Sequence, residues 1–214
     1  MAPQETPDSP LAGLRVIELS HILAAPTCGL MLADLGADVL KVERPPRGDS
    51  QRWDTAREDR LAEGTASFVQ VNRGKRSLCL DLKSAAGKQV LWRLLAEADV
   101  LLENYRPGVL GRLGFDRDSL QARCPRLIVC SISGFGLTGP LADQGGFDLM
   151  AQAMTGLMSV TGADGDGPPV KCGAPLTDIA AGLLAASPSW RRSTGAPARA
   201  AASCSTPRCS RPAS

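Results

Sequence analysis

Residues 15–43, RVIELSHILAAPTCGLMLADLGADVLKVE, decide the fold because they contain a complete β-α-β unit. RVIEL (15–19) and VLKVE (39–43) are short and aliphatic, as buried strands are. Between them, APTCGLMLADLG (25–36) predicts a helix that ends at Gly36. A strand, a helix and a second strand in this order favour a sheet with parallel strands.

The same alternation of strand-like and helix-like segments continues to about residue 186. Ser84 can cap a helix over residues 85–98, whose apolar side chains recur at helical spacing. The polar segment 44–67 predicts a long surface loop. Further strands are predicted at 77–82, 99–105 and 126–133, and further helices at 118–124 and 147–160. The fold class is therefore α/β, with an open, mainly parallel sheet covered by helices on both faces, and ligands are expected at the carboxyl ends of its strands.

The composition bounds the class of protein. The chain has 214 residues, of which 43% are hydrophobic and only 4% aromatic, so one domain with an aliphatic core is expected. No apolar run reaches the roughly 18 residues of a membrane span, and the polar N-terminus MAPQETPDSP lacks a secretion signal. We therefore expect a cytoplasmic protein without a membrane partner.

Charge and cysteine content exclude two further classes. Residues 187–214 hold five arginines and no acid, which leaves 19 basic and 22 acidic residues, a net charge of −3, in 1–186. This balance gives no reason to expect a nucleic-acid partner. The seven cysteines form no CxxC pair and the single histidine is His21, so no metal site is predicted.

A glycine-rich turn follows the predicted strand at 126–133. GFGLTG (134–139) fits the G-x-G-x-x-G pattern of dinucleotide-binding folds. However, Pro140 and LADQGG follow, where that motif requires a helix. A turn that lies close to some other ligand is the better interpretation.

Several single residues have both a structural and a functional interpretation. His21 follows a strand directly, so a structural role and a ligand contact are both open. Cys28 lies inside a predicted helix without a second histidine as its base, which favours simple burial. The basic residues near the second strand predict a solvated surface, although Arg44 is placed to meet a phosphate; they are Lys41, Arg44, Arg47, Arg52 and Arg57.

Asp178 is the only charged residue in GAPLTDIAAG (173–182). Carboxylates avoid apolar surroundings unless they have a partner or a task. One interpretation is that Thr177 or Asp178 caps a helix that begins at IAAGLLAA. The other is a nucleophilic carboxylate, whose anhydride or thioester would survive where water is excluded. The residues alone leave both open.

Seven segments in order resemble one family, the class III coenzyme A transferases of the formyl-CoA transferase and carnitine CoA-transferase type. The resemblance covers about residues 11–186, the N-terminal half of that family. It implies a Rossmann-like large domain, a second smaller domain and an interlocked homodimer. The segments are VIELSHILAAP, LADLGADVLKVERPPRGD, NRGKRSLCLDLK, DVLLENYRPGVLGRLGF, PRLIVCSISGFGLTGP, GGFDLMAQAMTGLMSVTG and GAPLTDIAAG.

The resemblance implies an activity and assigns Asp178 a role in it. CoA would pass from an acyl-CoA donor to a small carboxylic acid, with both as substrates and no permanently bound cofactor. Asp178 takes the place of the family's nucleophile, which forms an aspartyl anhydride and then an aspartyl-CoA thioester. Related acyl-CoA racemases use the histidine of a G-H-D motif, but 146-GFD-148 has Phe147 there. Transferase is therefore preferred over racemase.

The resemblance also implies contacts with CoA, position by position. Arg44 would meet the nucleotide phosphates, and Leu80, Asp81, Leu82 and Lys83 would lie around the adenine and ribose. Ser133 is a serine where some members have lysine. The remaining contacts are His21, Leu23, Ala24, Asn104, Tyr105, Arg106, Arg112, Ser133, Gly134, Phe135 and Gly136.

The two ends of the chain depart from the family pattern. We expect disorder in residues 1–10 and 187–214, on either side of the CoA-binding portion 11–186. The Arg, Ala, Pro, Ser, Gly and Cys bias of 187–214 is typical of GC-rich DNA read out of frame, so a frameshift or truncation is expected there. Members of the family are nearly twice as long. The alternative function is an inactive remnant with at most weak CoA binding.

Overall fold

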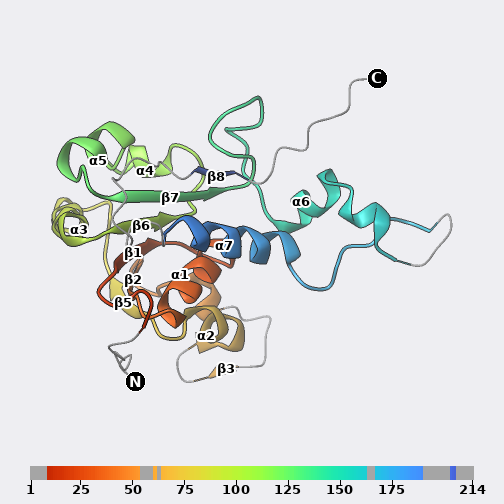
Figure 1. Ribbon diagram of the computed structural model, residues 1–214, viewed down its shortest axis with the longest axis horizontal. Coiled ribbons are helices and arrows are strands. Elements are labelled where there is room, and N and C mark those ends of the chain that lie inside the picture. Colours follow the sequence, from red (N-terminus) through yellow and green to blue (C-terminus); the bar gives the residue numbers. More distant parts are fainter. Residues whose placement is uncertain (1–8, 54–59, 62–63, 163–166, 190–202, 206–214) are drawn as a thin grey trace.

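The computed structural model describes residues 9–53, 60–61, 64–162, 167–189 and 203–205 (Figure 1). Its main sheet has six strands in the order β5-β2-β1-β6-β7-β8. Every neighbouring pair is parallel. The strands are β1 (Arg15–Leu19), β2 (Asp38–Glu43), β5 (Arg76–Cys79), β6 (Val100–Glu103), β7 (Ile128–Ser133) and β8 (Ser203–Ser205). This is the 3-2-1-4-5-6 order of a Rossmann fold, so the predicted fold class is confirmed.

Helices cover both faces of the sheet (Figure 1). One core cluster joins α1 (Ala24–Asp34) and α7 (Leu176–Ser189) to the sheet, and the other joins α3 (Ala85–Glu97) and α5 (Arg117–Arg123) to it. Strand β1 serves both clusters, because Val16 faces α1 while Ile17 and Leu19 face α3. The remaining elements are η1 (Ser50–Trp53), β3 (Arg60–Leu61), β4 (Gly64–Thr65), α2 (Ala66–Asn72), α4 (Val109–Arg112), α6 (Asp148–Met154) and η2 (Leu157–Val160).

Several predicted boundaries are confirmed. Ser84 caps α3 by accepting a hydrogen bond from the N–H of Gly87 at 3.0 Å. The chain leaves helix α1 at Gly36, whose positive φ of +97° is readily adopted only by glycine. Cys28 is fully buried in α1, as its position predicted.

Three expectations need correction. The strand predicted at 77–82 ends at Cys79, because the chain turns toward α3 and Ser84 N–H bonds to Asp81 O. The helix predicted at 147–160 is split by Gly156, which has a φ of +79°. The segment 44–67, predicted as a surface loop, contains η1, β3, β4 and the start of α2, and its Asp49 side chain is buried.

Helix α7 runs three residues beyond the predicted end of the domain, to Ser189. It passes Pro188, which has no N–H to offer the carbonyl of Leu184. The hydroxyl of Ser187 bonds that carbonyl instead, at 2.8 Å. Ser203–Ser205 pair with β7. The expected disorder of 1–8, 190–202 and 206–214 lies outside the described residues and stays a prediction.

Helix α7 packs closely on α1 because Gly182 has no side chain. A Cβ atom at Gly182 would lie 2.6 Å from the carbonyl oxygen of Ala24 and 2.7 Å from the Cβ of Thr27. This close approach brings the start of α7 to the carboxyl ends of the strands (Figure 1). Within the described part of the chain, no helix combines the length and the apolar content that a bilayer span requires.

We predict that Gly182→Val lowers the free energy of unfolding by about 1–3 kcal/mol, because the added atoms must push α7 away from α1. The matched control is Ala180→Val on the exposed side of the same helix, where only helix propensity changes. Urea denaturation measures both. Equal losses for the two variants would show that the α1–α7 contact is not tight.

Candidate active site

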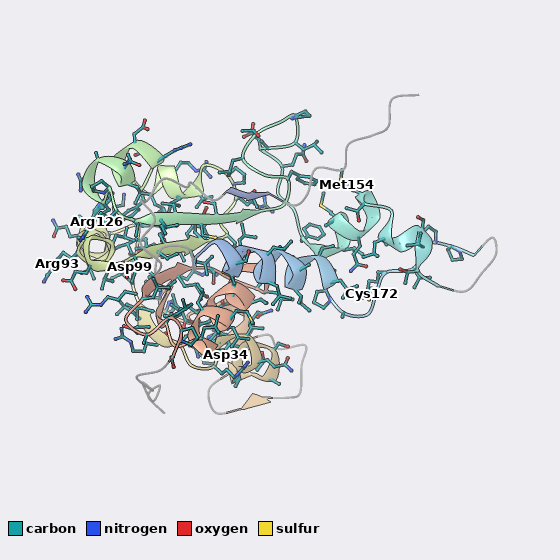
Figure 2. All side chains as sticks on the ribbon, in the orientation of Figure 1. Asp34, Arg93, Asp99, Arg126, Met154 and Cys172 are labelled. Atoms are coloured by element: carbon teal, nitrogen blue, oxygen red, sulfur yellow. The ribbon has the colours of Figure 1, made fainter. Side chains whose placement is uncertain are left out.

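The site lies where the parallel strands end. The carboxyl ends of β5, β2, β1, β6 and β7 form one edge of the sheet, and the loops that follow them carry the predicted CoA contacts. Strands β1 and β6 are neighbours at the point where the strand order reverses, which is the preferred ligand position in such sheets. Met154 and Cys172 lie at this end of the molecule, whereas Arg93, Asp99 and Arg126 lie at the other (Figure 2).

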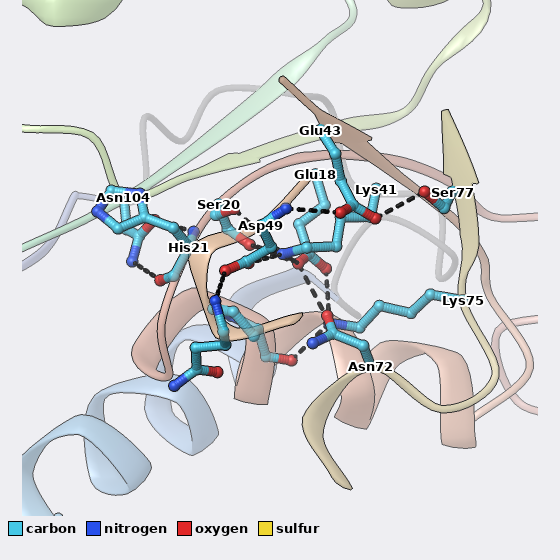
Figure 3. A network of polar contacts seen from close by, with 12 residues as sticks. Glu18, Ser20, His21, Lys41, Glu43, Asp49, Asn72, Lys75, Ser77 and Asn104 are labelled. Carbon is cyan, nitrogen blue, oxygen red and sulfur yellow. Dashed lines mark hydrogen bonds and ion pairs between the residues drawn. The ribbon is translucent and has the colours of Figure 1, made fainter. Parts of the chain in front are cut away.

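Two hydrogen bonds lock the loop after β1 to the loop after β6. The N–H of His21 donates to Asn104 Oδ1 at 3.0 Å, and Asn104 Nδ2 donates to the carbonyl of His21 at 2.9 Å (Figure 3). The rings of His21 and Tyr105 stack, with centroids 6.0 Å apart. Burial lowers the pKa of His21, so its ring is neutral at pH 7.

A cavity of about 220 Å³ opens between these loops and the start of α7. It brings together residues from five separate parts of the chain. The predicted site residues that line it are His21, Leu23, Ala24, Asn104, Tyr105, Arg106, Ser133, Gly134, Phe135 and Asp178. The cavity is small for a whole CoA molecule.

The other predicted contacts lie outside this cavity. Arg44 is exposed after β2 and is close enough to His21 and Tyr105 to affect the pKa of both. Leu82 packs in the core against α3, so its side chain is not free for a ligand. The remaining positions are Leu80, Asp81 and Lys83 between β5 and α3, exposed Arg112 on α4, and buried Gly136 in the turn after β7.

The turn after β7 depends on a contact between two glycines. A Cβ atom on Gly134 would lie 2.4 Å from the Cα of Gly146, and one on Gly146 would lie 2.5 Å from the Cα of Gly134. The turn GFGLTG is followed by further turns and no helix until Asp148. The turn therefore lacks the helix that a dinucleotide fingerprint requires. Sequence reasoning found Gly134 but missed Gly146.

Asp178 lies in the first turn of α7 and is half-buried. Burial, followed by the nearby charge of Asp148, raises the pKa of its carboxyl to about 6. The proposal that Thr177 or Asp178 caps the helix is wrong, because α7 begins at Leu176 and both residues already lie inside it. The acceptor at this helix end is Asp148, which the sequence had not singled out. Its Oδ1 accepts from the Thr177 N–H at 2.9 Å and from the Thr177 hydroxyl at 2.6 Å.

A buried ion network lies directly beneath the loop after β1 (Figure 3). Lys41 Nζ is 3.2 Å from Glu18 Oε1 and 3.0 Å from Asp49 Oδ2, and each of these side chains is at most 1% exposed. Lys75 Nζ contacts Glu18 Oε2 at 2.9 Å. The expected solvated surface is therefore wrong for Lys41. Glu18 and Lys41 are charged residues within two apolar strands, and this pattern was the signal that could have revealed the pair. The two residues lie opposite each other in the register of β1 and β2.

Glu43 holds a second buried carboxylate at the end of β2. Burial alone would raise the pKa of Glu43, but hydrogen bonds from Arg52, Ser77 and the Asp49 N–H lower it to about 2. Arg52 donates to both carboxylate oxygens at 2.7 Å, so Arg52 is also not a freely solvated residue. Together with Asp49, this pair folds the segment after β2 against the sheet.

The network fixes the loop that reaches the cavity. Lys41 Nζ donates to the carbonyl of Ser20 at 3.1 Å and to its hydroxyl at 3.0 Å. Ile22, two residues later, has a φ of +66°, which is unusual for a β-branched residue and persists only where the surroundings enforce it. Among the described residues, no group of three or more His, Cys, Asp or Glu side chains could hold a metal ion.

A model of CoA-transferase family III matches residues 11–188. The chain is 46% identical over 184 residues to a succinate–glutarate CoA-transferase of Agrobacterium fabrum, covering 83% of this chain and 45% of that protein. It is 42% identical over 179 residues to an acetyl-CoA:oxalate CoA-transferase of Acetobacter aceti, with coverages of 83% and 45%. The chain thus spans less than half the length of these relatives.

Solved structures give the same result. A CAIB/BAIF family protein from Brucella suis superposes with a TM-score of 0.80 at 45% identity, covering 87% of this chain and 51% of that one. The orthorhombic form of Rv3272 from Mycobacterium tuberculosis superposes with a TM-score of 0.75 at 36% identity, covering 85% and 49%.

We predict that Lys41→Met lowers the free energy of unfolding by about 3–5 kcal/mol, because Glu18 and Asp49 would stay buried without their shared cation. The control is Arg76→Met, which breaks the exposed Arg76–Asp38 pair on the neighbouring strand and should cost about 0–1 kcal/mol. Chemical denaturation at pH 7 measures both losses. A loss below that of the control would contradict the assigned role of Lys41.

We predict that Asp178→Asn stabilises the fold at pH 7.5. The pKa of Asp178 is raised from 3.8 to about 6, so its contribution to stability is present below pH 3.8 and is lost as the pH rises through about 6. The asparagine variant avoids that loss, and its Tm at pH 7.5 should be higher by about 2–4 °C. The difference should disappear at pH 4, whereas exposed Asp143→Asn should change little at either pH. Differential scanning calorimetry at the two pH values tests this.

Proposed function

Because the chain belongs to CoA-transferase family III, we propose that it transfers coenzyme A from an acyl-CoA donor to a carboxylic acid. Relatives of the chain are named for succinate, glutarate and oxalate, so we propose short dicarboxylic acids as the substrate class. The chain spans less than half of those relatives, and the proposal therefore concerns the part of the site that these residues supply.

The observation that carries the proposal is the position of Asp178. Its half-buried carboxyl shares one cavity with the locked loops at His21 and Asn104. With a pKa of about 6, the group is ionised at pH 7.5 and yet more basic than an ordinary aspartate. A basic carboxylate that is still ionised is a better nucleophile.

The chemistry exchanges acyl–oxygen and acyl–sulfur bonds in turn. A carboxylate oxygen of Asp178 attacks the thioester carbon of the donor, the C–S bond breaks and CoA leaves as the thiolate. The thiolate then attacks the aspartyl carbonyl of the mixed anhydride, which releases the donor acid and leaves an aspartyl-CoA thioester. The acceptor carboxylate attacks this thioester and expels the thiolate again. Attack of the thiolate on the acceptor acyl carbon forms the new acyl-CoA and regenerates Asp178.

The walls of the cavity support such intermediates. Leu23, Ile132, Phe135, Phe147 and Ala181 line it with apolar atoms, which limits hydrolysis of an anhydride or a thioester. Phe147 has no proton to exchange, which favours transfer over racemisation.

The CoA chain itself would run along the carboxyl edge of the sheet. We place its phosphates near Arg44 and its adenine near Leu80–Lys83, beside the end of β5. Its reacting end would pass Asn104, Tyr105 and Arg106 toward the turn at Ser133–Gly136. Arg112 would contact it from α4. A homodimer and a cytoplasmic location complete this proposal.

We predict that incubation with succinyl-CoA adds the mass of CoA, less one water, to the intact chain. The adduct should be absent in Asp178→Ala and retained in Asp143→Asn, which replaces an exposed aspartate. Intact-mass spectrometry detects the change, and hydroxylamine should remove it because it cleaves thioesters.

Two results would contradict this proposal, the first at the nucleophile and the second at transfer itself. An adduct that survives in Asp178→Ala would assign the nucleophile elsewhere. Saturable binding of CoA without any adduct, in a folded sample, would favour the alternative of a non-catalytic CoA-binding protein.

A further inference from the structure

Asp148 caps helix α7 although it belongs to a different helix. The first hydrogen bond of α7 runs from the N–H of Ile179 to the carbonyl of Pro175, so Pro175 stands at the cap position and offers no side-chain acceptor. Asp148, in the first turn of α6, supplies it. Its Oδ1 accepts from the N–H of Thr177 at 2.9 Å and from that of Asp178 at 3.4 Å.

The carboxylate of Asp148 is held from its other side as well. Gln152, one turn later in α6, is fully buried and donates from Nε2 to Asp148 Oδ2 at 2.6 Å. The Oε1 of Gln152 accepts from the N–H of Cys172 at 2.8 Å. The segment that leads into α7 is therefore tied to the same pair of side chains. Asp148 cannot rotate without breaking contacts on both sides.

Asp148 carries a negative charge at this position. Burial would raise its pKa, but hydrogen bonds from Thr177 and Gln152 outweigh that effect and lower it. An ionised carboxylate thus stands beside Asp178. The other titratable groups that face the cavity are His21, Tyr105 and Arg106.

The start of α7 therefore presents opposing influences to Asp178. The helix N-terminus favours its anion, whereas burial and Asp148 favour its protonated form. Asp148 is the one of these that also contacts the backbone of Asp178 itself. It can therefore set both where the nucleophile points and how basic it is.

We propose that Asp148, braced by Gln152, is a positioning residue that aims the Asp178 carboxylate into the cavity and keeps it basic. This inference rests on the proposed function, because it assumes that Asp178 is the nucleophile. It also gives 146-GFD-148 a role in this chain that does not require a histidine at position 147.

The test compares Asp148→Asn with Asp116→Asn. Asp148→Asn keeps a carbonyl oxygen for the N–H of Thr177 but removes the charge. Asp116 caps α5 by accepting from Ser119 N–H at 2.9 Å and does not line the cavity, so its replacement reports the loss of a cap's charge outside the site. Carbon-13 NMR titration of the aspartate carboxyls follows Asp178, which is assigned from Asp178→Asn.

The titration point of Asp178 should fall by about one pH unit in Asp148→Asn and should not move in Asp116→Asn. The rate of CoA-adduct formation at pH 8 should fall about tenfold in Asp148→Asn, because the carboxylate is less well aimed and less basic. The acidic side of the pH–rate profile for adduct formation should move to lower pH in Asp148→Asn. A purely structural role would lower the Tm and leave the titration point and the acidic side of that profile unchanged, and that result would overturn the proposal.

The wild-type protein provides a test in which Asp148 itself is unchanged. If Asp178 titrates at the ordinary value of an aspartate, Asp148 does not influence it and the inference is wrong. The titration does not depend on transfer. A raised titration point that responds to Asp148, together with no CoA adduct, would refute the proposed function while leaving the coupling between the two aspartates intact.

Discussion

The Lys41 side chain is buried among the carboxylates of Glu18 and Asp49. The positions of the site's loops depend on these buried ion pairs. Lys41 contacts Glu18 of β1, Asp49 of the segment after β2 and the backbone of Ser20. A buried cation of this kind is tolerated only with its partners in place. Gly29 leaves room for them, since a Cβ atom there would lie 1.9 Å from Glu18 Oε2. Correct folding of the sheet therefore places the loop at His21 at the same time.

The second requirement is the close approach of separate backbones. Gly182 lets α7 lie on α1, and the contact of Gly134 with Gly146 holds the turn after β7 against the segment before α6. Each contact brings a distant part of the chain to the strand ends. Asp178 reaches the cavity because both backbone contacts, at Gly182 and at Gly134–Gly146, are formed. The site is thus a product of packing on the helical face of the sheet as much as of the strands themselves.

The proposed chemistry then depends on two carboxylates in different surroundings. Asp148 is saturated with hydrogen bonds and stays ionised, whereas Asp178 is half-buried and has a raised pKa. Such divergent surroundings allow one carboxylate to orient and the other to react. In the proposed reaction this arrangement suits a nucleophile that must attack an acyl group and later leave it.

The sequence by itself determined the α/β class, the strand–helix alternation, the Ser84 cap and Asp178 as the exceptional acid, because these follow from periodicity and local chemistry. The resemblance of its motifs added the family. Only the tertiary structure decided that Lys41 and Asp49 are buried, that Asp148 caps α7 and that Gly146 meets Gly134. A charged residue within an apolar strand, such as Lys41, is a local sign of a buried partner. Residues in separate loops carry no such sign, since their contacts arise only when the helices and loops pack on the sheet.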